Sequence, residues 1–232
     1  MRLRELLIST AMMSLTFASA KAITPPLPSP LIEEDKVLGT AYYDTLSILS
    51  TPNECSDFFG GPSASVEVFN SFIEKVRKDY FSPWIGIRMS GSAVNVLNAR
   101  TNRKYRLFDK VSINGNGPFY QRKHSVGQVF VPGVGSFEAN TKEVRVLMFL
   151  HELGHIVKGQ NGDWLLPDDG QNEALSRDNT KKIEEVCGGQ IKNLGKGDTV
   201  MNSAKGKFTT EKRADHVGAA LMGTTGAAYT KP

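Results

Sequence analysis

The spacing of apolar residues along the chain predicts several helices. Apolar residues recur at three- and four-residue intervals over about 66–80, which predicts one helix. A second is predicted from Asn140 to Gly159, because its apolar residues keep the same spacing between a capping residue and a terminal glycine. A third is predicted over 177–187, ended by the glycines that follow. The stretch 31–51 fits a helix or a strand equally well.

The middle of the chain carries shorter apolar runs that predict strands. The runs at 84–87, 94–97, 105–113 and 119–131 are short and rich in β-branched and aromatic residues. The last two flank Asn-Gly-Asn-Gly at 114–117, which is a strong turn signal. We expect a fold of the α+β class.

The first 20 residues have the features of a secretory signal peptide. Arg2 and Arg4 precede an apolar run of 12 residues from Leu6 to Phe17, and Ala18-Ser19-Ala20 is a small-x-small cleavage site. The run is shorter than the about 20 residues that span a bilayer. We therefore expect residues 1–20 to be removed, the mature chain to be secreted, and no stable membrane insertion after cleavage.

The exported part divides into three regions by composition. Residues 21–30 form a Pro-rich lead-in, residues 31–190 hold all the periodic segments and are expected to form one domain, and residues 191–232 are expected to be a flexible basic tail. The tail has seven Lys and Arg against three Asp and Glu, which accounts for the net charge of +4. It lacks interleaved aromatic residues and any nucleic-acid motif, so we expect no nucleic acid partner.

The chain has two cysteines, Cys55 and Cys187. Oxidising compartments favour disulfides, so export predicts that the two are bridged. Each lies at the end of a predicted segment, where a bridge can tie the last helix to the loop before the first.

The strongest chemical signal is the sequence His-Glu-Leu-Gly-His, which begins at His151. Residues four apart on a helix share one face, so the imidazoles of His151 and His155 can bind one zinc ion at about 2.0–2.1 Å. Glu152 lies beside them, where it can take a proton from a zinc-bound water and pass it to a leaving group. Apolar Val144 and Leu147 precede His151 on the same face, which indicates that this face is buried.

This segment resembles the active-site helix of the zincin metallopeptidases, whose motif is HExxH among uncharged residues; residues 149–157 fit it throughout. The resemblance implies a single zincin-like catalytic domain over 31–190, in which a twisted sheet packs on the active-site helix. It also implies a cleft along the edge strand, zinc as cofactor and a peptide or protein as substrate. Residues 151–187 further resemble uncharacterised secreted bacterial proteins that carry HELGH, PDDG and NTxxI, for which no substrate is known.

The third protein ligand of such a site is left open by the sequence. The residues three and six positions after the second histidine are not the Gly and His of metzincins. Glu173 lies in an Asn-Glu-Ala-x-Ser stretch similar to that of thermolysin-like enzymes. The run Pro-Asp-Asp-Gly at 167–170 offers a carboxylate on a loop that can fold back, although it also suits an ordinary turn. We predict Asp168 as the ligand and keep Asp169 and Glu173 as alternatives; Asp163, Glu184 and Glu185 are weaker candidates.

The motif predicts a secreted zinc-dependent hydrolase, most simply a metallopeptidase. Tyr120 or His124 can in addition stabilise a tetrahedral intermediate, although plain strand residues are the commoner reading. One alternative is a secreted protein that binds zinc for structure or recognition without turnover. Another is a binding module in which HELGH is incidental. Bound metal separates the last reading from the others, and substitution of Glu152 separates the first two.

Overall fold

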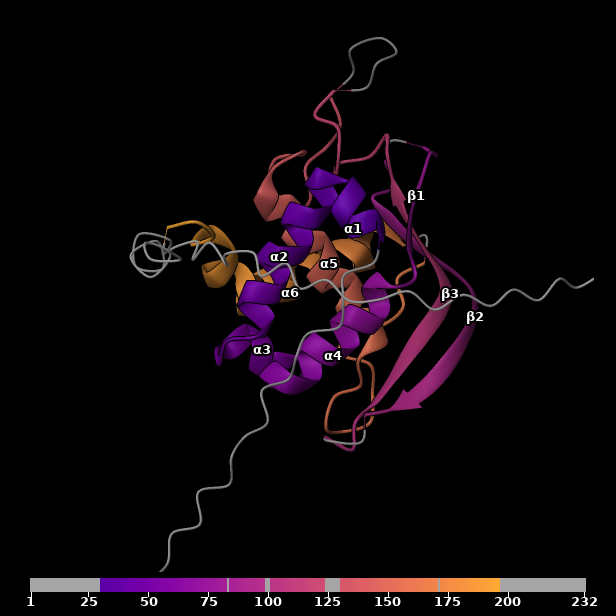
Figure 1. The fold of residues 1–232 in the computed structure, drawn as a ribbon, viewed down its shortest axis with the longest axis vertical. Coiled ribbons are helices and arrows are strands. Elements are labelled where there is room, and N and C mark those ends of the chain that lie inside the picture. The colour runs from indigo at the N-terminus through magenta and orange to yellow at the C-terminus, as the bar shows by residue number, and fades with distance from the viewer. Residues whose placement is uncertain (1–29, 83, 99–100, 124–129, 171, 197–232) are drawn as a thin grey trace, which may run out of the picture. The chain divides into compact units, whose positions relative to one another are not determined.

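Helices and a small sheet lie side by side in this computed structural model, which describes residues 30–82, 84–98, 101–123, 130–170 and 172–196 (Figure 1). The chain divides into two units, Met1–Lys192 and Asn193–Pro232. All helices and strands discussed below belong to the first unit. In the second, residues 193–196 form a turn. The predicted signal peptide, the lead-in up to residue 29 and the tail beyond residue 196 lie outside the described residues.

The described part contains six helices, several of which begin at capping residues. Asp35 accepts hydrogen bonds from the backbone N–H groups of Val37 and Leu38, both at 3.1 Å, and so fixes the start of the second helix. Asn53 and Ser56 form a capping box at the third. The helices are α1 Pro30–Glu34, α2 Lys36–Leu49, α3 Glu54–Phe58, α4 Pro62–Ile73, α5 Lys142–Ile156 and α6 Glu173–Lys192. The ambiguous stretch 31–51 is therefore helical.

The sheet has three strands in the order β1-β3-β2: β1 Val76–Asp79, β2 Ile87–Leu97 and β3 Lys104–Asn114. β3 pairs with β1 in parallel and with β2 antiparallel. β3 and the turn after it were predicted, and Gly117 N–H donates to the Asn114 carbonyl at 3.1 Å in that turn. The two short runs at 84–87 and 94–97 were predicted as separate strands, but a single β2 takes up most of this region.

Two predictions about element bounds are wrong. The helix expected over 66–80 ends at Ile73, and the chain turns into β1 instead. Val76 is buried and fits the helical period, but it pairs with Val111 of β3, and this pairing places the segment in a strand. No strand forms in the described part of 119–131, where only the isolated bridge Lys123↔Phe130 is found.

The core is centred on Phe149 of α5. Its ring lies 5.6 Å from that of Phe69, 6.1 Å from that of Phe72 and 5.2 Å from that of Phe119, measured between centroids. All four rings are fully buried, and burying each stabilises the fold by about 1.5–3 kcal/mol. This cluster holds α5 against α4 and the segment that follows β3.

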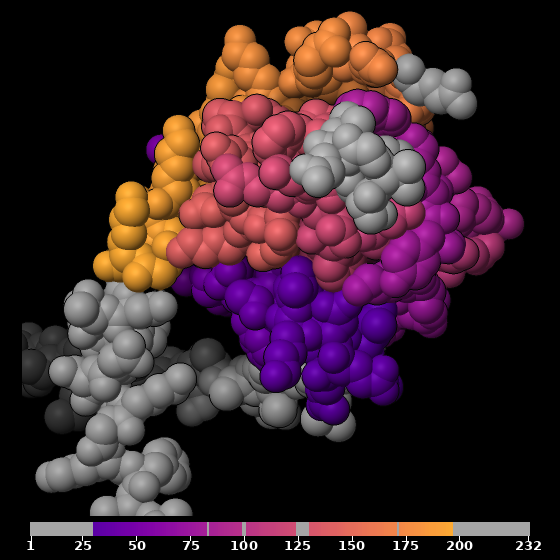
Figure 2. Space-filling view, turned by 90° about the horizontal axis from the view of Figure 1, so that it is seen from above, coloured from indigo at the N-terminus to yellow at the C-terminus, as the bar shows by residue number. Residues whose placement is uncertain are grey.

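The predicted α+β class is confirmed, but α5 is covered more by helices than by the sheet. α5 packs mainly against α2 and α6, whereas β3 contacts both α4 and α5. The chain leaving α5 meets β3, where Lys158 N–H donates to the Lys104 carbonyl at 3.1 Å. The N-terminal helices, in indigo, lie directly against the pink segment that follows β3 (Figure 2). Tyr120 of this segment donates a hydrogen bond to Asp35 at 2.9 Å.

The last helix is longer than predicted. α6 runs to Lys192 through Gly188 and Gly189, which were expected to end it, and Ile191 is fully buried. Helix α6 therefore extends past the predicted domain boundary at residue 190. The predicted bridge between Cys55 and Cys187 is present and joins α3 to α6. Among the described helices, none is long and apolar enough to cross a bilayer.

Candidate metal centre

The helix that carries the motif is capped and deeply buried. Its N-cap is Thr141, whose hydroxyl accepts a hydrogen bond from Val144 N–H at 3.2 Å, one residue after the predicted cap Asn140. Most of its residues are buried, and they lie on all faces of the helix, as expected for a helix at the centre of a core. His151 and His155 are only 7% and 3% exposed. Two imidazoles in such a place need polar partners.

A return of the chain brings a carboxylate to these histidines. After α5 the chain loops out and comes back, so that Leu165 N–H donates to the Val157 carbonyl and Leu166 N–H to the Gly154 carbonyl, both at 3.0 Å. The next residues, 167–170, are the Pro-Asp-Asp-Gly run. These two hydrogen bonds hold residues 167–170 over the last turn of α5, although these residues lie more than ten positions beyond the end of the helix.

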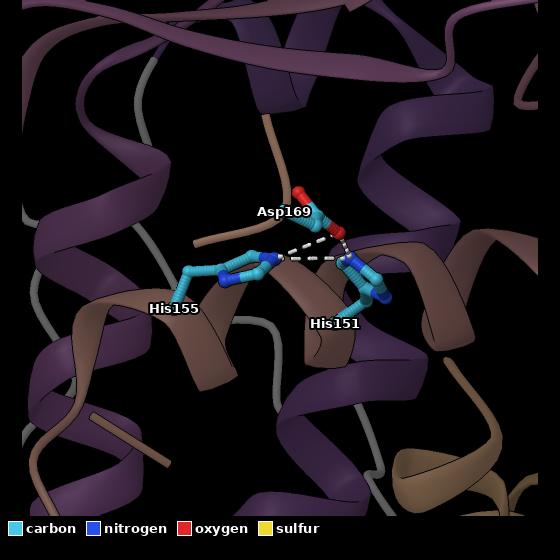
Figure 3. A group of neighbouring side chains, drawn as sticks. All are labelled: His151, His155 and Asp169. Atoms are coloured by element: carbon cyan, nitrogen blue, oxygen red, sulfur yellow. Dashed lines mark hydrogen bonds and ion pairs between the residues drawn. The ribbon is translucent and has the colours of Figure 1, made fainter. Parts of the chain in front are cut away.

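Three side chains converge at the centre of the site (Figure 3). His151 Nε2 and His155 Nε2 lie 3.1 Å apart. Asp169 Oδ2 lies 3.2 Å from the first and 3.4 Å from the second. Two residues come from α5 and the third from the loop after it. Within the part of the chain that the structure describes, these three form the group of side chains suited to holding a metal ion.

The triangle of donor atoms has the size that zinc requires. Four ligands at about 2.0–2.1 Å in a tetrahedron lie about 3.3–3.4 Å from one another. The three separations of 3.1, 3.2 and 3.4 Å lie close to that edge length. The donor set, two imidazoles and a carboxylate, is also one that zinc accepts. The residues present therefore fit a zinc ion with three protein ligands and one open position.

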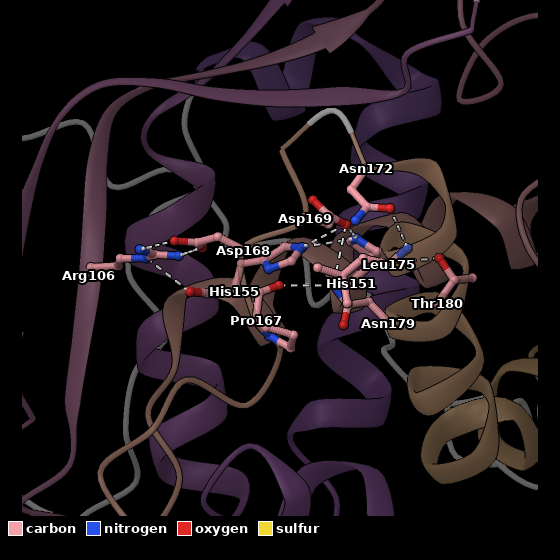
Figure 4. Close-up of polar contacts among 10 residues, drawn as sticks. All are labelled: Arg106, His151, His155, Pro167, Asp168, Asp169, Asn172, Leu175, Asn179 and Thr180. Carbon is pink, nitrogen blue, oxygen red and sulfur yellow. Dashed lines mark hydrogen bonds and ion pairs between the residues drawn. The ribbon is translucent and has the colours of Figure 1, made fainter.

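Residues of α6 orient two of these three side chains (Figure 4). Thr180 Oγ1 lies 3.0 Å from His151 Nδ1, so this ring nitrogen can donate its proton and leave Nε2 free to bind metal. Asn179 Nδ2 donates to the Pro167 carbonyl at 3.0 Å and to Asp169 Oδ2 at 3.4 Å. Both α6 residues are buried. Helix α6 thus contacts both the Asp169 carboxylate and the His151 imidazole.

The charges of His151, His155 and Asp169 strongly influence one another. Burial would lower the pKa of His151, but the hydrogen bond to Asp169 and the charges of Glu152 and Asp169 outweigh it and raise the pKa. Burial and the neighbouring His151 lower the pKa of His155. Burial would raise the pKa of Asp169, but the two histidines hold it well below its usual range. The imidazole of His151 and the carboxylate of Asp169 therefore stabilise each other's charged forms.

Glu152 lies beside the triangle and has the environment of a proton carrier. Burial raises the pKa of its carboxyl from 4.5 to about 7, with the charge of Asp169 adding to the rise and that of His151 opposing it. A carboxyl with a pKa near neutral can both accept and release a proton at physiological pH.

The structure separates the candidates for the third ligand. Asp168, the first choice from the sequence, turns away from the histidines and forms an ion pair with Arg106 of β3. Asp169, kept as an alternative, is the carboxylate beside the two imidazoles. Glu173 is the first residue of α6; its side chain is 90% exposed and lies 3.6 Å from Arg177. Sequence spacing alone does not decide which of two adjacent aspartates points inward.

The remaining candidates have other partners. Asp163 accepts a hydrogen bond from Asn161, Glu184 accepts two from Ser136, and Glu185 lies 3.9 Å from Lys181. Tyr120 donates to Asp35 at 2.9 Å. His124 lies outside the described residues.

Sequence reasoning missed the supporting residues Arg106, Asn179 and Thr180. Asn179 and Thr180 are the first two residues of the NTxxI pattern, so the resemblance contained a signal for them. Arg106 lies in a strand far along the chain from the motif and carried no local signal. No protein-family model, curated protein or solved structure matches this chain.

Proposed function

We propose that this protein is an exported zinc-dependent hydrolase, a metallopeptidase, in which His151, His155 and Asp169 hold the zinc. The observation that carries this proposal is the donor triangle, with separations of 3.1, 3.2 and 3.4 Å. Three protein ligands are typical of catalytic zinc sites, whereas structural sites use four. The proposal replaces Asp168 with Asp169 as third ligand.

Glu152 is the proposed general base. Bound zinc would supply a Lewis acid that lowers the pKa of a coordinated water towards 7. Glu152 accepts the proton that this water loses and delivers it to the leaving nitrogen of the substrate. Its raised pKa suits both halves of that transfer, because the carboxylate is basic enough to accept the proton and the acid is strong enough to release it.

Secretion and a peptide substrate belong to the same proposal. The disulfide between Cys55 and Cys187 is typical of an oxidising compartment, and it agrees with the signal peptide expected over residues 1–20. A peptide or protein is the substrate class that the zincin resemblance implies. We expect no nucleic acid partner, because the basic tail lacks interleaved aromatic residues and any nucleic-acid motif.

The test measures bound metal and hydrolysis on the same samples of exported protein. Elemental analysis covers zinc and iron, because two histidines and a carboxylate also bind ferrous iron. A general peptide library, with cleavage products read by mass spectrometry, reports activity. We expect about one zinc per chain and chelator-sensitive cleavage.

Substitutions then separate the roles. His151→Ala, His155→Ala and Asp169→Ala should each lose zinc, because two ligands hold it poorly. Glu152→Gln should keep the zinc while cleavage falls by about 10²-fold or more. Exported wild-type protein that binds no metal would refute the proposed zinc site. Metal binding that persists with no cleavage by wild type or Glu152→Gln would instead support a zinc-binding protein without turnover.

A further inference from the structure

Arg106 joins the strand, the motif helix and the ligand loop. Its side chain leaves β3 and its Nε donates to the His155 backbone carbonyl at 3.0 Å. Its Nη1 donates to Asp168 Oδ2 at 3.1 Å, and its Nη2 contacts Asp168 Oδ1. Its guanidinium also lies over the ring of Trp164, 4.3 Å from the centroid. The Arg106 side chain thus contacts both the backbone of His155 and the side chain of Asp168, the residue next to Asp169.

The two adjacent aspartates point to opposite sides of the loop. Figure 4 shows Asp168 directed toward Arg106 and Asp169 toward the two histidines. The two residues are adjacent in the chain, so an anchored Asp168 restricts the position that Asp169 can take. Fixing Asp168 against Arg106 therefore turns Asp169 to the donor triangle.

The geometry of the contact requires an arginine. A guanidinium offers donors in a rigid fork that matches a carboxylate, whereas a lysine ammonium is a single point charge. Here one edge of the fork serves Asp168, and Nε serves the helix end. The Arg106 side chain is only 13% exposed, so its guanidinium is largely shielded from water. Lysine can retain the charge but not both contacts.

We propose that Arg106 is a positioning residue that directs the Asp169 carboxylate at the metal through its ion pair with Asp168. Arg106 touches neither the metal ligands' donor atoms nor the reacting groups. By binding the His155 carbonyl and Asp168 together, it sets the distance between α5 and the ligand loop. This inference rests on the proposed zinc site, and it assigns Asp168 a function other than ligation.

The test measures zinc affinity by competition with a chelator of known affinity, and records the visible absorption spectrum of cobalt-substituted protein. The exported wild-type protein is compared with Arg106→Lys, Asp168→Asn and the double variant. We expect each single substitution to weaken zinc binding by about 10- to 100-fold, the usual effect of losing a group that orients a ligand. The cobalt spectrum should change, because the carboxylate no longer sits in one place.

The double variant distinguishes positioning from a general loss of stability. If Arg106 acts through Asp168, the double variant should bind zinc about as weakly as the single ones, not with the two losses multiplied. The exposed pair of Arg122 and Glu138, with side chains 62% and 69% exposed, provides the matched control. Arg122→Lys and Glu138→Gln should leave zinc affinity and the cobalt spectrum unchanged.

The outcomes separate this inference from the proposed function. Wild-type protein that binds no zinc overturns the metal site itself. Wild-type protein that binds zinc, with Arg106→Lys and Asp168→Asn binding it equally tightly, overturns only the role of Arg106. If Arg106→Lys fails to fold, Asp168→Asn decides alone, because the Asp168 side chain is 65% exposed and its amide removes little packing.

Discussion

The side chain of Leu166 lies directly on Gly154, the small residue between the two histidines of the motif. A Cβ added at Gly154 would lie 2.6 Å from both Cδ1 and Cγ of Leu166. Leu166 is fully buried, and its backbone N–H donates to the Gly154 carbonyl at 3.0 Å. The glycine therefore lets the returning chain approach the helix closely, three residues before Asp169.

Gly154→Ala should disturb both the fold and the site. The added methyl group overlaps a buried side chain, and overpacking of this kind costs about 1–3 kcal/mol of stability. Because Leu166 must shift, the ligand loop moves with it, and zinc affinity should fall as well. Gly189→Ala in α6 is the control, since nothing lies within 4 Å of its added Cβ. That change should raise stability by roughly 0.5–1 kcal/mol. Denaturation curves and zinc competition on both variants test this, and an unaffected Gly154→Ala variant would show that the loop tolerates displacement.

The motif helix was predictable because two independent periods coincide there. The apolar spacing and the histidine spacing both follow one helical turn, so α5 and its buried face were found from local sequence. β3 and the turn after it were found because a run rich in β-branched and aromatic residues is followed by Asn-Gly-Asn-Gly. The disulfide followed from cysteine count and compartment, without any knowledge of distance.

The missed features depend on contacts that local sequence does not encode. Val76 fits a helical period, but pairing with Val111 in β3 places it in a strand. Gly188 is buried inside α6, where packing overrides its low helix propensity. The choice between Asp168 and Asp169 depends on Arg106, which lies 62 residues before Asp168. Each outcome was decided by a partner distant in sequence.

Thr180 is predicted to support metal binding through His151. Thr180→Val keeps the shape of the side chain but removes the hydroxyl that meets His151 Nδ1 at 3.0 Å. The ring nitrogen then loses its partner in a buried place, and zinc affinity should fall by about 10-fold or more. Thr180→Ser keeps the hydroxyl and should bind zinc nearly as wild type does. Equal zinc affinity in the Val and Ser variants would show that this hydrogen bond does not orient the histidine.

The disulfide is predicted to stabilise the fold and, through α6, the metal site. Cys187 lies about two turns beyond Thr180 on the same helix. Replacing both cysteines with alanine should lower the free energy of unfolding by about 2–4 kcal/mol, because the open chain gains freedom in the unfolded state. Zinc affinity should fall in the same variant and in reduced wild type. Reductant added to the double alanine variant should change nothing further. Wild-type stability that is the same with and without reductant would contradict the prediction.

Glu152 is predicted to lower the stability of the metal-free protein at alkaline pH. The pKa of its carboxyl rises from 4.5 in the unfolded chain to about 7 in the folded one. Below pH 4.5 both states are protonated, so the group costs nothing. Between 4.5 and 7 the folded state holds the proton more tightly than the unfolded state, so stability falls as pH rises. Above pH 7 both states are ionised and the whole cost is present.

Glu152→Gln should therefore stabilise the chelator-treated protein at pH 8 and have little effect at pH 4. We expect a gain of roughly 1–3 kcal/mol at pH 8, where each unit of pKa shift corresponds to about 1.4 kcal/mol and partial solvent screening reduces the total. The other titrating groups of the site are present in both proteins, so their main effects cancel in the comparison. Glu173→Gln is the control, because that side chain is 90% exposed and its loss should change stability by no more than about 0.5 kcal/mol. Urea denaturation at the two pH values measures the difference. A Glu152→Gln variant that is no more stable than wild type at pH 8 would mean that the carboxylate is well solvated, and the case for Glu152 as a tuned base would lose its electrostatic support.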